Sequence, residues 1–158
     1  MDEHEDPIRQ LFTRHGLRCT RQRRLIYQAL AATKSHPSAD ELYQQISPQD
    51  RRLSLATVYN ALDAFCAAGM AIRLPSHVNS GGSPSARYDA NVNDHLHARC
   101  ENSGAVVDVP EHLSQQVMAH LSPELLEQIE SELGFKVNRV HIELLGQYQR
   151  FNGQGMHI

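Results

Sequence analysis

Two histidines separated by a single residue are the plainest candidates for chemistry in this chain. His95 and His97 alternate with apolar residues across the segment 94–100. Successive side chains of a β-strand point to opposite faces, so a strand here would place both imidazoles on one face. Imidazole is the commonest metal ligand among side chains. The pair predicts a metal site, although solvent-facing histidines produce the same pattern.

A carboxylate follows in the next apolar run. Asp108 lies in the segment 105–109, which comes after the turn residues 101–104 and is otherwise apolar. An isolated carboxylate among valines requires a partner, and a metal ion would provide one. We therefore group Asp108 with His95 and His97 as one candidate site.

A second candidate surface is the start of a predicted helix, 55–68. Ser54 would cap it and Gly69 would end it. Thr57 could bond a phosphate, Tyr59 could contact a thymine methyl, and Asn60 could reach a base edge. The alternative is an ordinary amphipathic helix with solvated polar residues.

The charge distribution favours nucleic-acid binding by the first half of the chain only. Residues 7–75 hold ten Lys/Arg against four Asp/Glu, whereas residues 76–158 hold five against ten, although the net charge of the chain is -3. Neutralising phosphate requires local positive charge, which Arg18, Arg23 and neighbouring arginines would supply. A solvated arginine-rich helix is the alternative explanation.

The candidate residues fall in two regions that the sequence predicts to fold differently. Helical periodicity predicts helices over 8–15, 21–32, 39–47 and 55–68, and two short strands, 70–74 and 86–90, flank a Gly81-Gly82 turn. This order is typical of a winged helix-turn-helix domain, here residues 1–90. The fold class is therefore predicted as α+β, with a small α/β domain second.

The second domain follows a hinge at 91–94 and spans 95–150, before a flexible tail at 151–158. We predict strands 94–100 and 105–109, helices 111–121 and 123–133, and a long strand 137–147. Because its core would be small, we expect it to form a homodimer. The residues expected to face its core are Leu113, Val117, Leu125, Leu126 and Ile129.

Composition excludes several other classes of protein. The first residues are acidic and no long apolar run follows, so we expect no signal peptide, no membrane span and a cytoplasmic location. Cys19, Cys66 and Cys100 are far apart and form no C-x-x-C pair, which argues against a disulfide framework.

Together the motifs resemble the ferric-uptake-regulator family, most closely its peroxide-stress repressor branch. The resemblance covers nearly the whole chain. It rests on 16–18 with 22–23, His36-Pro37-Ser38-Ala39-Asp40-Glu41-Leu42-Tyr43, Leu55-Ala56-Thr57-Val58-Tyr59-Asn60, Arg87-Tyr88-Asp89, 94–102, 106–108 and Gly134-Phe135-Lys136-Val137.

The resemblance implies a homodimeric repressor that is not an enzyme and binds double-stranded DNA at an AT-rich palindromic operator. One regulatory site per subunit would hold Fe(II) or Mn(II), to which nitrogen and oxygen ligands are suited. Its implied ligands are His36, Asp89, His95, His97 and Asp108, and its implied DNA-binding residues are Arg18, Arg23, Thr57, Tyr59 and Asn60.

Aspartates at 89 and 108 are similar to the peroxide-sensing branch, which implies Fe(II)-dependent oxidation of His36 and His95. One departure concerns the family's structural zinc. Its first C-x-x-C has become Cys100-x-x-Ser103 and the second is missing after Gly146, so we predict no structural zinc.

Two other functions compete with peroxide sensing. An iron- or manganese-responsive regulator of the same family would use the same ligands without responding to peroxide. A small non-haem iron enzyme would also use histidines and a carboxylate, but the sequence shows no barrel-like strand pattern.

Overall fold

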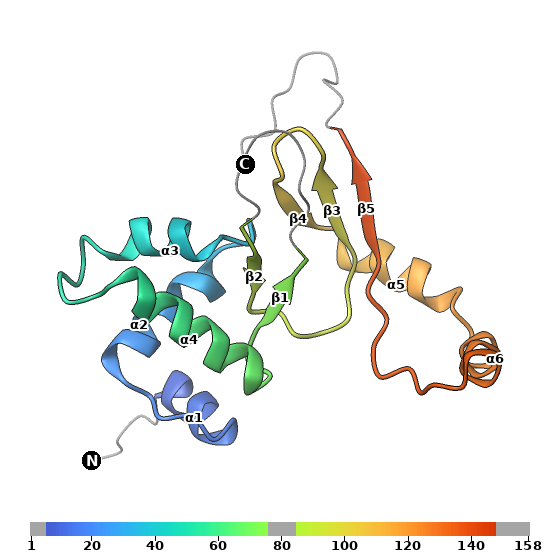
Figure 1. Ribbon diagram of the computed structural model, residues 1–158, viewed down its shortest axis with the longest axis horizontal. Helices are drawn as coiled ribbons and strands as arrows, with labels where there is room; N and C mark the ends of the chain where they lie inside the picture. Colours follow the sequence, from blue (N-terminus) through green and yellow to red (C-terminus); the bar gives the residue numbers. More distant parts are fainter. Residues whose placement is uncertain (1–5, 76–84, 148–158) are drawn as a thin grey trace. The chain divides into compact units, whose positions relative to one another are not determined.

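The computed structural model describes residues 6–75 and 85–147, and the chain divides into two compact units, Met1–Val92 and Asn93–Ile158. Figure 1 labels their helices and strands. The first unit holds α1 (Pro7–Arg14), α2 (Arg21–Ala32), α3 (Ala39–Ile46), α4 (Leu55–Ala67), β1 (Ile72–Leu74) and β2 (Arg87–Asp89). Helices followed by paired strands agree with the predicted winged-helix domain.

Local capping explains where these helices begin. Ser38 accepts a hydrogen bond from the Glu41 amide while the Glu41 side chain accepts from the Ser38 amide, which forms a complete capping box for α3. Thr20 and Ser54 cap α2 and α4 through their hydroxyl groups. These signals are local in sequence, and the predicted boundaries of all four helices fall within two residues of the observed ones.

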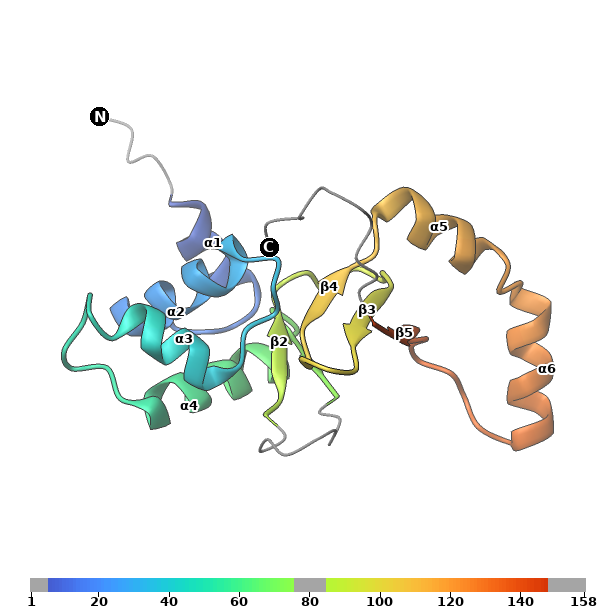
Figure 2. The ribbon, with the colours of Figure 1, turned by 90° about the horizontal axis from the view of Figure 1, so that it is seen from above.

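An apolar core joins the helices of the first unit, which Figure 2 shows side by side. Phe12, Tyr27 and Phe65 lie at its centre, where their rings contact one another edge to face with centroids 5.5 to 5.7 Å apart. Such aromatic contacts add to the free energy gained by burial alone. The core fixes α4 against α2 and α3, so the polar start of α4 has a rigid support.

The strands of the first unit pair as the wing prediction requires. β1 and β2 are antiparallel, with Ile72 opposite Asp89 and Leu74 opposite Arg87. The predicted Gly81-Gly82 turn lies outside the described residues, as do the tail 151–158 and the first five residues. An isolated bridge between Ser38 and Arg87 attaches β2 to the start of α3.

The second unit contains a mixed three-stranded sheet in the order β4-β3-β5. β3 (His97–Cys100) pairs antiparallel with β4 (Val106–Asp108) and parallel with β5 (Glu143–Gly146). The predicted long strand 137–147 was wrong, because the backbone is extended into a ladder only where it meets β3. The observed strand β3 is also shorter than the predicted strand 94–100, and His95 lies before it.

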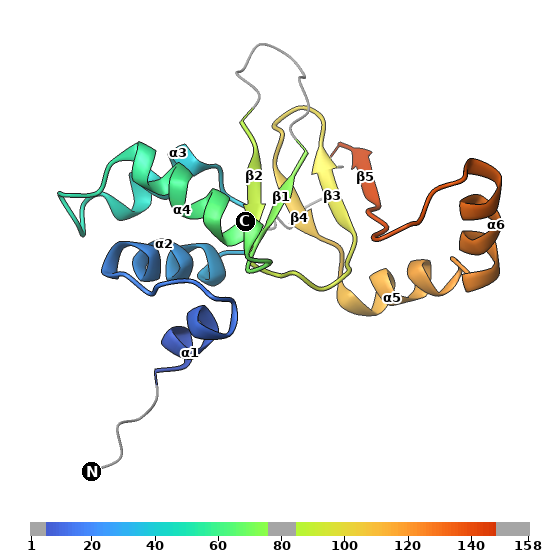
Figure 3. The ribbon, with the colours of Figure 1, turned by 60° about the horizontal axis from the view of Figure 1, so that its bottom comes forward.

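The helices of the second unit are α5 (Glu111–Ala119) and α6 (Pro123–Leu133). Figure 3 shows α6 standing away from the sheet of its own unit. The prediction that their apolar residues face a core was wrong for four of them, which are exposed in the single chain: Leu113, Val117, Leu125 and Ile129. No described helix combines the length and apolar character needed to cross a lipid bilayer.

Candidate metal centre and nucleic-acid interface

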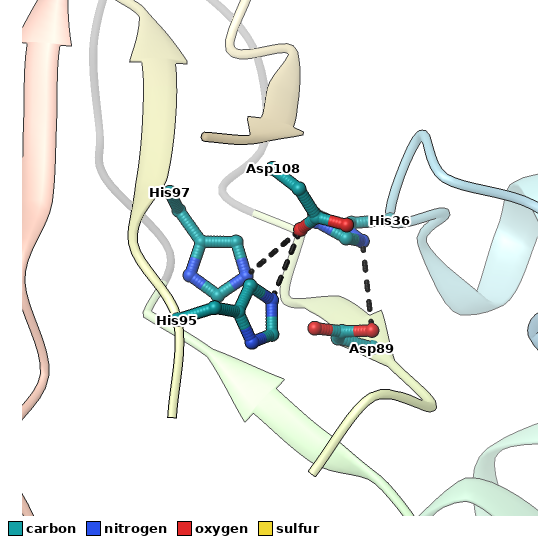
Figure 4. Close-up of side chains that lie close together, drawn as sticks. All are labelled: His36, Asp89, His95, His97 and Asp108. Atoms are coloured by element: carbon teal, nitrogen blue, oxygen red, sulfur yellow. Dashed lines mark hydrogen bonds and ion pairs between the residues drawn. The ribbon is translucent and has the colours of Figure 1, made fainter. Parts of the chain in front are cut away.

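The first unit contributes a buried histidine and a buried carboxylate. His36 lies in the segment between α2 and α3, and Asp89 ends β2, with 1% and 5% of their surfaces exposed. Nδ1 of His36 lies 3.9 Å from Oδ1 of Asp89, as the dashed line in Figure 4 marks. Pro37 accepts a hydrogen bond from the Tyr88 amide, which fixes this segment to β2. Residues 53 positions apart are thereby brought together.

The second unit contributes two histidines and a carboxylate. His97 opens β3 opposite Asp108 of β4, and Nε2 of His97 lies 3.5 Å from Oδ1 of Asp108. Nε2 of His95 lies 3.0 Å from the same oxygen, and the two imidazole centroids are 4.4 Å apart (Figure 4). The two histidines therefore share one side, as the alternation predicted, although His95 lies outside the strand.

The donor atoms suit a divalent metal of intermediate hardness. Each of these five side chains offers one nitrogen or oxygen ligand atom, and none offers a thiolate. Imidazole and carboxylate together suit Fe(II) and Mn(II), whereas structural zinc sites favour cysteine. Buried histidines and carboxylates also require polar partners, which a bound cation would provide. The residues present therefore fit the metal that the sequence implied.

One further histidine of the second unit, His141, lies beside His97 and was not among the predicted ligands. The ring of His141 lies 5.5 Å from that of His97, centroid to centroid. Burial and the nearby His97 lower the pKa of His141 below its usual value. Sequence reasoning treated 137–147 as one strand, and a break before β5 carried no visible signal.

The predicted DNA-binding residues of the first unit gather around one hollow. A cavity of about 400 Å³ lies between the start of α2 and the start of α4. Its lining includes four of the five predicted residues, Arg18, Arg23, Thr57 and Asn60, and two that were not predicted, Thr20 and Gln22. Thr20 was recognisable only as a helix cap. Two arginines and several hydroxyl and amide groups form a surface suited to phosphate.

Tyr59, the fifth predicted residue, lies beside α3. Its hydroxyl donates to Oδ2 of Asp40 at 3.0 Å, and 40% of its surface is exposed. This hydrogen bond, more than burial, raises the pKa of Tyr59 above its ordinary value. The ring is thus held at the surface of the helix by a neighbouring carboxylate.

The sequence matches the model of the Ferric uptake regulator family over residues 14–145. The Peroxide operon regulator of Bacillus subtilis is 33% identical over 147 residues, or 90% of this chain and 89% of the relative. The Peroxide-responsive repressor PerR of Staphylococcus saprophyticus is 40% identical over 104 residues, and the match spans 66% of each protein.

Solved structures show the same fold. A zinc-bound manganese uptake regulator superposes with a TM-score of 0.61 at 28% identity, covering 91% of this chain and all of that one. The ferric uptake regulator of Pseudomonas aeruginosa with manganese gives 0.61 at 26% identity, covering 89% of this chain and 97% of that one.

Proposed function

This chain belongs to the ferric uptake regulator family, and we propose that it is a homodimeric, metal-dependent transcriptional repressor that responds to peroxide. The observation that carries the proposal is the set of His36 and Asp89 in one unit and His95, His97 and Asp108 in the other, of which His36, Asp89 and His97 are buried and the other two partly buried. The enzyme alternative is set aside, because the family consists of regulators and the relatives are named repressors.

The five ligands belong, in this proposal, to one Fe(II) or Mn(II) ion per subunit. Two of them come from the DNA-binding unit and three from the second unit. Coordination by both sets would restrict how the units are oriented, and a ligand that favours one conformation shifts the population toward it. The favoured conformation would place two α4 helices in successive major grooves of an AT-rich palindrome. A repressor working on DNA would act in the cytoplasm.

The DNA contacts follow from the side chains around the hollow. Arg18 and Arg23 would neutralise phosphates, while Thr57 and Asn60 would bond the backbone or a base edge. Arg23 Nη1 already donates to the Arg18 carbonyl at 3.2 Å, which orients its guanidinium along this surface. Tyr59 would contact a thymine methyl.

Peroxide sensing would act through the same ligands. Hydrogen peroxide would be the two-electron oxidant: one of its oxygen atoms would be added to the imidazole of His36 or His95, and the other would leave as water. Fe(II) held by these ligands would supply the redox chemistry that cleaves the O–O bond. An oxidised ring binds metal less well, so the units would be released from one another and from DNA.

Fluorescence anisotropy with a labelled AT-rich palindrome tests the repressor. Saturating Mn(II) should raise the DNA affinity of the full chain about tenfold or more, a coupling typical of allosteric proteins. His97→Ala should remove that increase. His112→Ala, which changes an exposed histidine of α5, is the matched control and should preserve it. Equal DNA affinity of the native chain with and without metal would refute the proposal.

Mass spectrometry tests the signal. After the Fe(II)-loaded protein meets hydrogen peroxide, the peptides that carry His36 and His95 should gain the mass of one oxygen atom. The Mn(II)-loaded protein should remain unchanged. Metal-dependent DNA binding without this gain would favour the second candidate, an iron or manganese regulator that does not respond to peroxide.

A further inference from the structure

We propose that Arg87 is a positioning residue, which holds His36 in its metal-binding conformation and connects this ligand to the first turn of α3. The inference rests on the proposed metal site. It concerns residues of the first unit alone, and it assigns a function to an arginine that binds neither metal nor DNA in the proposal above.

The backbone of His36 requires an unusual constraint. Its φ angle is 47°, the one positive value among the described residues other than glycine. A residue with a Cβ adopts this left-handed region at a cost, so the surrounding structure must stabilise it. The His36 carbonyl accepts a hydrogen bond from Nη1 of Arg87 at 3.0 Å. Arg87 thus fixes the peptide that follows the strained residue.

The same guanidinium reaches the capping box of α3. Nη1 of Arg87 donates to Oε2 of Glu41 at 3.1 Å, and Nη2 lies 3.4 Å from Oε1. Oε2 of Glu41 also accepts the Ser38 amide at 2.8 Å. The side chain of Arg87 is 17% exposed and that of Glu41 50%, so the arginine is held against the protein while the carboxylate partly faces water. One guanidinium therefore links the His36 peptide to the N-terminus of α3.

Arg87 also shares a strand with the second ligand of this unit. It lies two residues before Asp89 in β2, and residues two apart in a strand lie on the same face. The bridge between Ser38 and Arg87 and the hydrogen bond from the Tyr88 amide to Pro37 attach β2 to the segment that carries His36. β2 consequently supplies one ligand and orients the other.

The geometry requires an arginine. A guanidinium offers five N–H donors in a rigid fork, which allows it to hold a carbonyl and a carboxylate at once. A lysine in its place would keep the charge, but its single ammonium group lacks the planar fork that reaches the carbonyl and the carboxylate together. Groups that orient a metal ligand typically contribute about 10- to 100-fold to metal affinity.

Mn(II) titration of the full chain tests this role. Arg87→Ala should weaken Mn(II) binding about tenfold or more, and Arg87→Lys should recover part of the loss. Arg73→Ala is the matched control, because Arg73 is an exposed arginine of the neighbouring strand, opposite Tyr88. It should keep the affinity within about twofold of the native chain.

A double-mutant cycle separates positioning from general stability. In a His36→Ala background the ligand that Arg87 orients is gone, so Arg87→Ala should then change Mn(II) affinity by less than about twofold. An equal loss in both backgrounds would overturn the proposal, and so would native affinity in Arg87→Ala. If Arg87→Ala does not fold, Glu41→Gln replaces it. Glutamine keeps the capping box but removes the charge that orients Arg87, and the same cycle with His36→Ala applies.

Failure of the proposed function would look different. If His36→Ala, with Arg87 intact, binds Mn(II) as tightly as the native chain, the ligand set is wrong and Arg87 loses its role with it. If His36→Ala weakens binding but the Arg87 and Glu41 variants do not, the metal site stands and only the positioning role is overturned.

Discussion

The two units differ in how much of their apolar surface each one buries. In the first unit, side chains of all four helices meet in one core that includes Phe12, Leu42 and Phe65. Among the described residues of the second unit, few apolar side chains are fully buried, Leu96 and Val106 among them, whereas α5 and α6 leave apolar side chains in contact with solvent. Contiguous exposed apolar surface usually marks an interaction site.

This difference indicates how each half is stabilised. The first unit resembles a self-sufficient small domain, whose proposed DNA-binding surface lies on a packed interior. The second unit depends more on ionic contacts within its sheet and, in our proposal, on a second copy of the chain. The effects of substitutions on stability and self-association should therefore differ between the two units, both in size and in kind.

The largest effect should come from the first unit's core. Phe65→Ala removes a fully buried ring that contacts Phe12 and Tyr27, and should lower the free energy of unfolding by about 3 to 5 kcal/mol. Denaturant unfolding monitored by circular dichroism measures it. Val92→Ala, at a side chain 38% exposed in the same unit, should change stability by no more than about 0.5 kcal/mol. A small loss for Phe65→Ala would contradict a self-sufficient core.

The sequence predicted the first unit better than the second because the relevant signals differ in range. The capping box at Ser38 and Glu41 is local, and α3 begins where it predicts. The extent of β5, in contrast, is decided by its pairing with β3, whose residues lie over 40 positions earlier. A periodic apolar pattern at 137–147 could not reveal where that pairing begins.

The candidate metal site divides in the same way. His95, His97 and Asp108 were grouped from local alternation, and the structure brings them together. His36 and Asp89 came only from the family resemblance, because nothing local connects residues 53 positions apart. Arg87 was part of a recognised motif, but its contact with the His36 carbonyl depends on a tertiary arrangement that the motif does not encode.

The second unit should be sensitive to loss of a buried ion pair. Arg99 of β3 and Glu143 of β5 approach to 2.8 Å, with side chains 6% and 9% exposed. Arg99→Met leaves the buried Glu143 carboxylate without this cation and should lower the free energy of unfolding by about 3 kcal/mol. The double variant Arg99→Met with Glu143→Leu should recover most of that stability. Thermal unfolding of the three proteins measures this.

Arg139→Met provides the matched control for the ion pair. Arg139 pairs with Asp94 at 3.2 Å in the same unit, but both side chains are about half exposed. Loss of this pair should lower the free energy of unfolding by less than about 1 kcal/mol. Equal costs at Arg99 and Arg139 would show that burial does not distinguish the two pairs, and the sheet of the second unit would not depend on Arg99.

A smaller effect on folding but a clear one on assembly is expected at α6. Ile129→Glu places a charge on the exposed apolar face and should weaken self-association about 30-fold or more, as central interface residues do. Sedimentation velocity measures the dimer fraction. Ser131→Glu adds the same charge about 200° around the helix and should leave association unchanged. Native association of Ile129→Glu would exclude this face as the dimer surface.

The smallest effect concerns a surface contact of the first unit. The hydrogen bond from Tyr59 to Asp40 favours the neutral phenol, which raises the pKa of Tyr59. In Asp40→Ala this pKa should fall toward its ordinary value, as an NMR titration of assigned tyrosine signals would show. The folded pKa exceeds the unfolded one, so the stabilisation from this hydrogen bond is present below the unfolded pKa. It is lost as pH rises through the folded pKa. Tyr59→Phe should abolish that pH dependence. An unchanged Tyr59 pKa in Asp40→Ala would show that Asp40 of α3 does not hold the phenol.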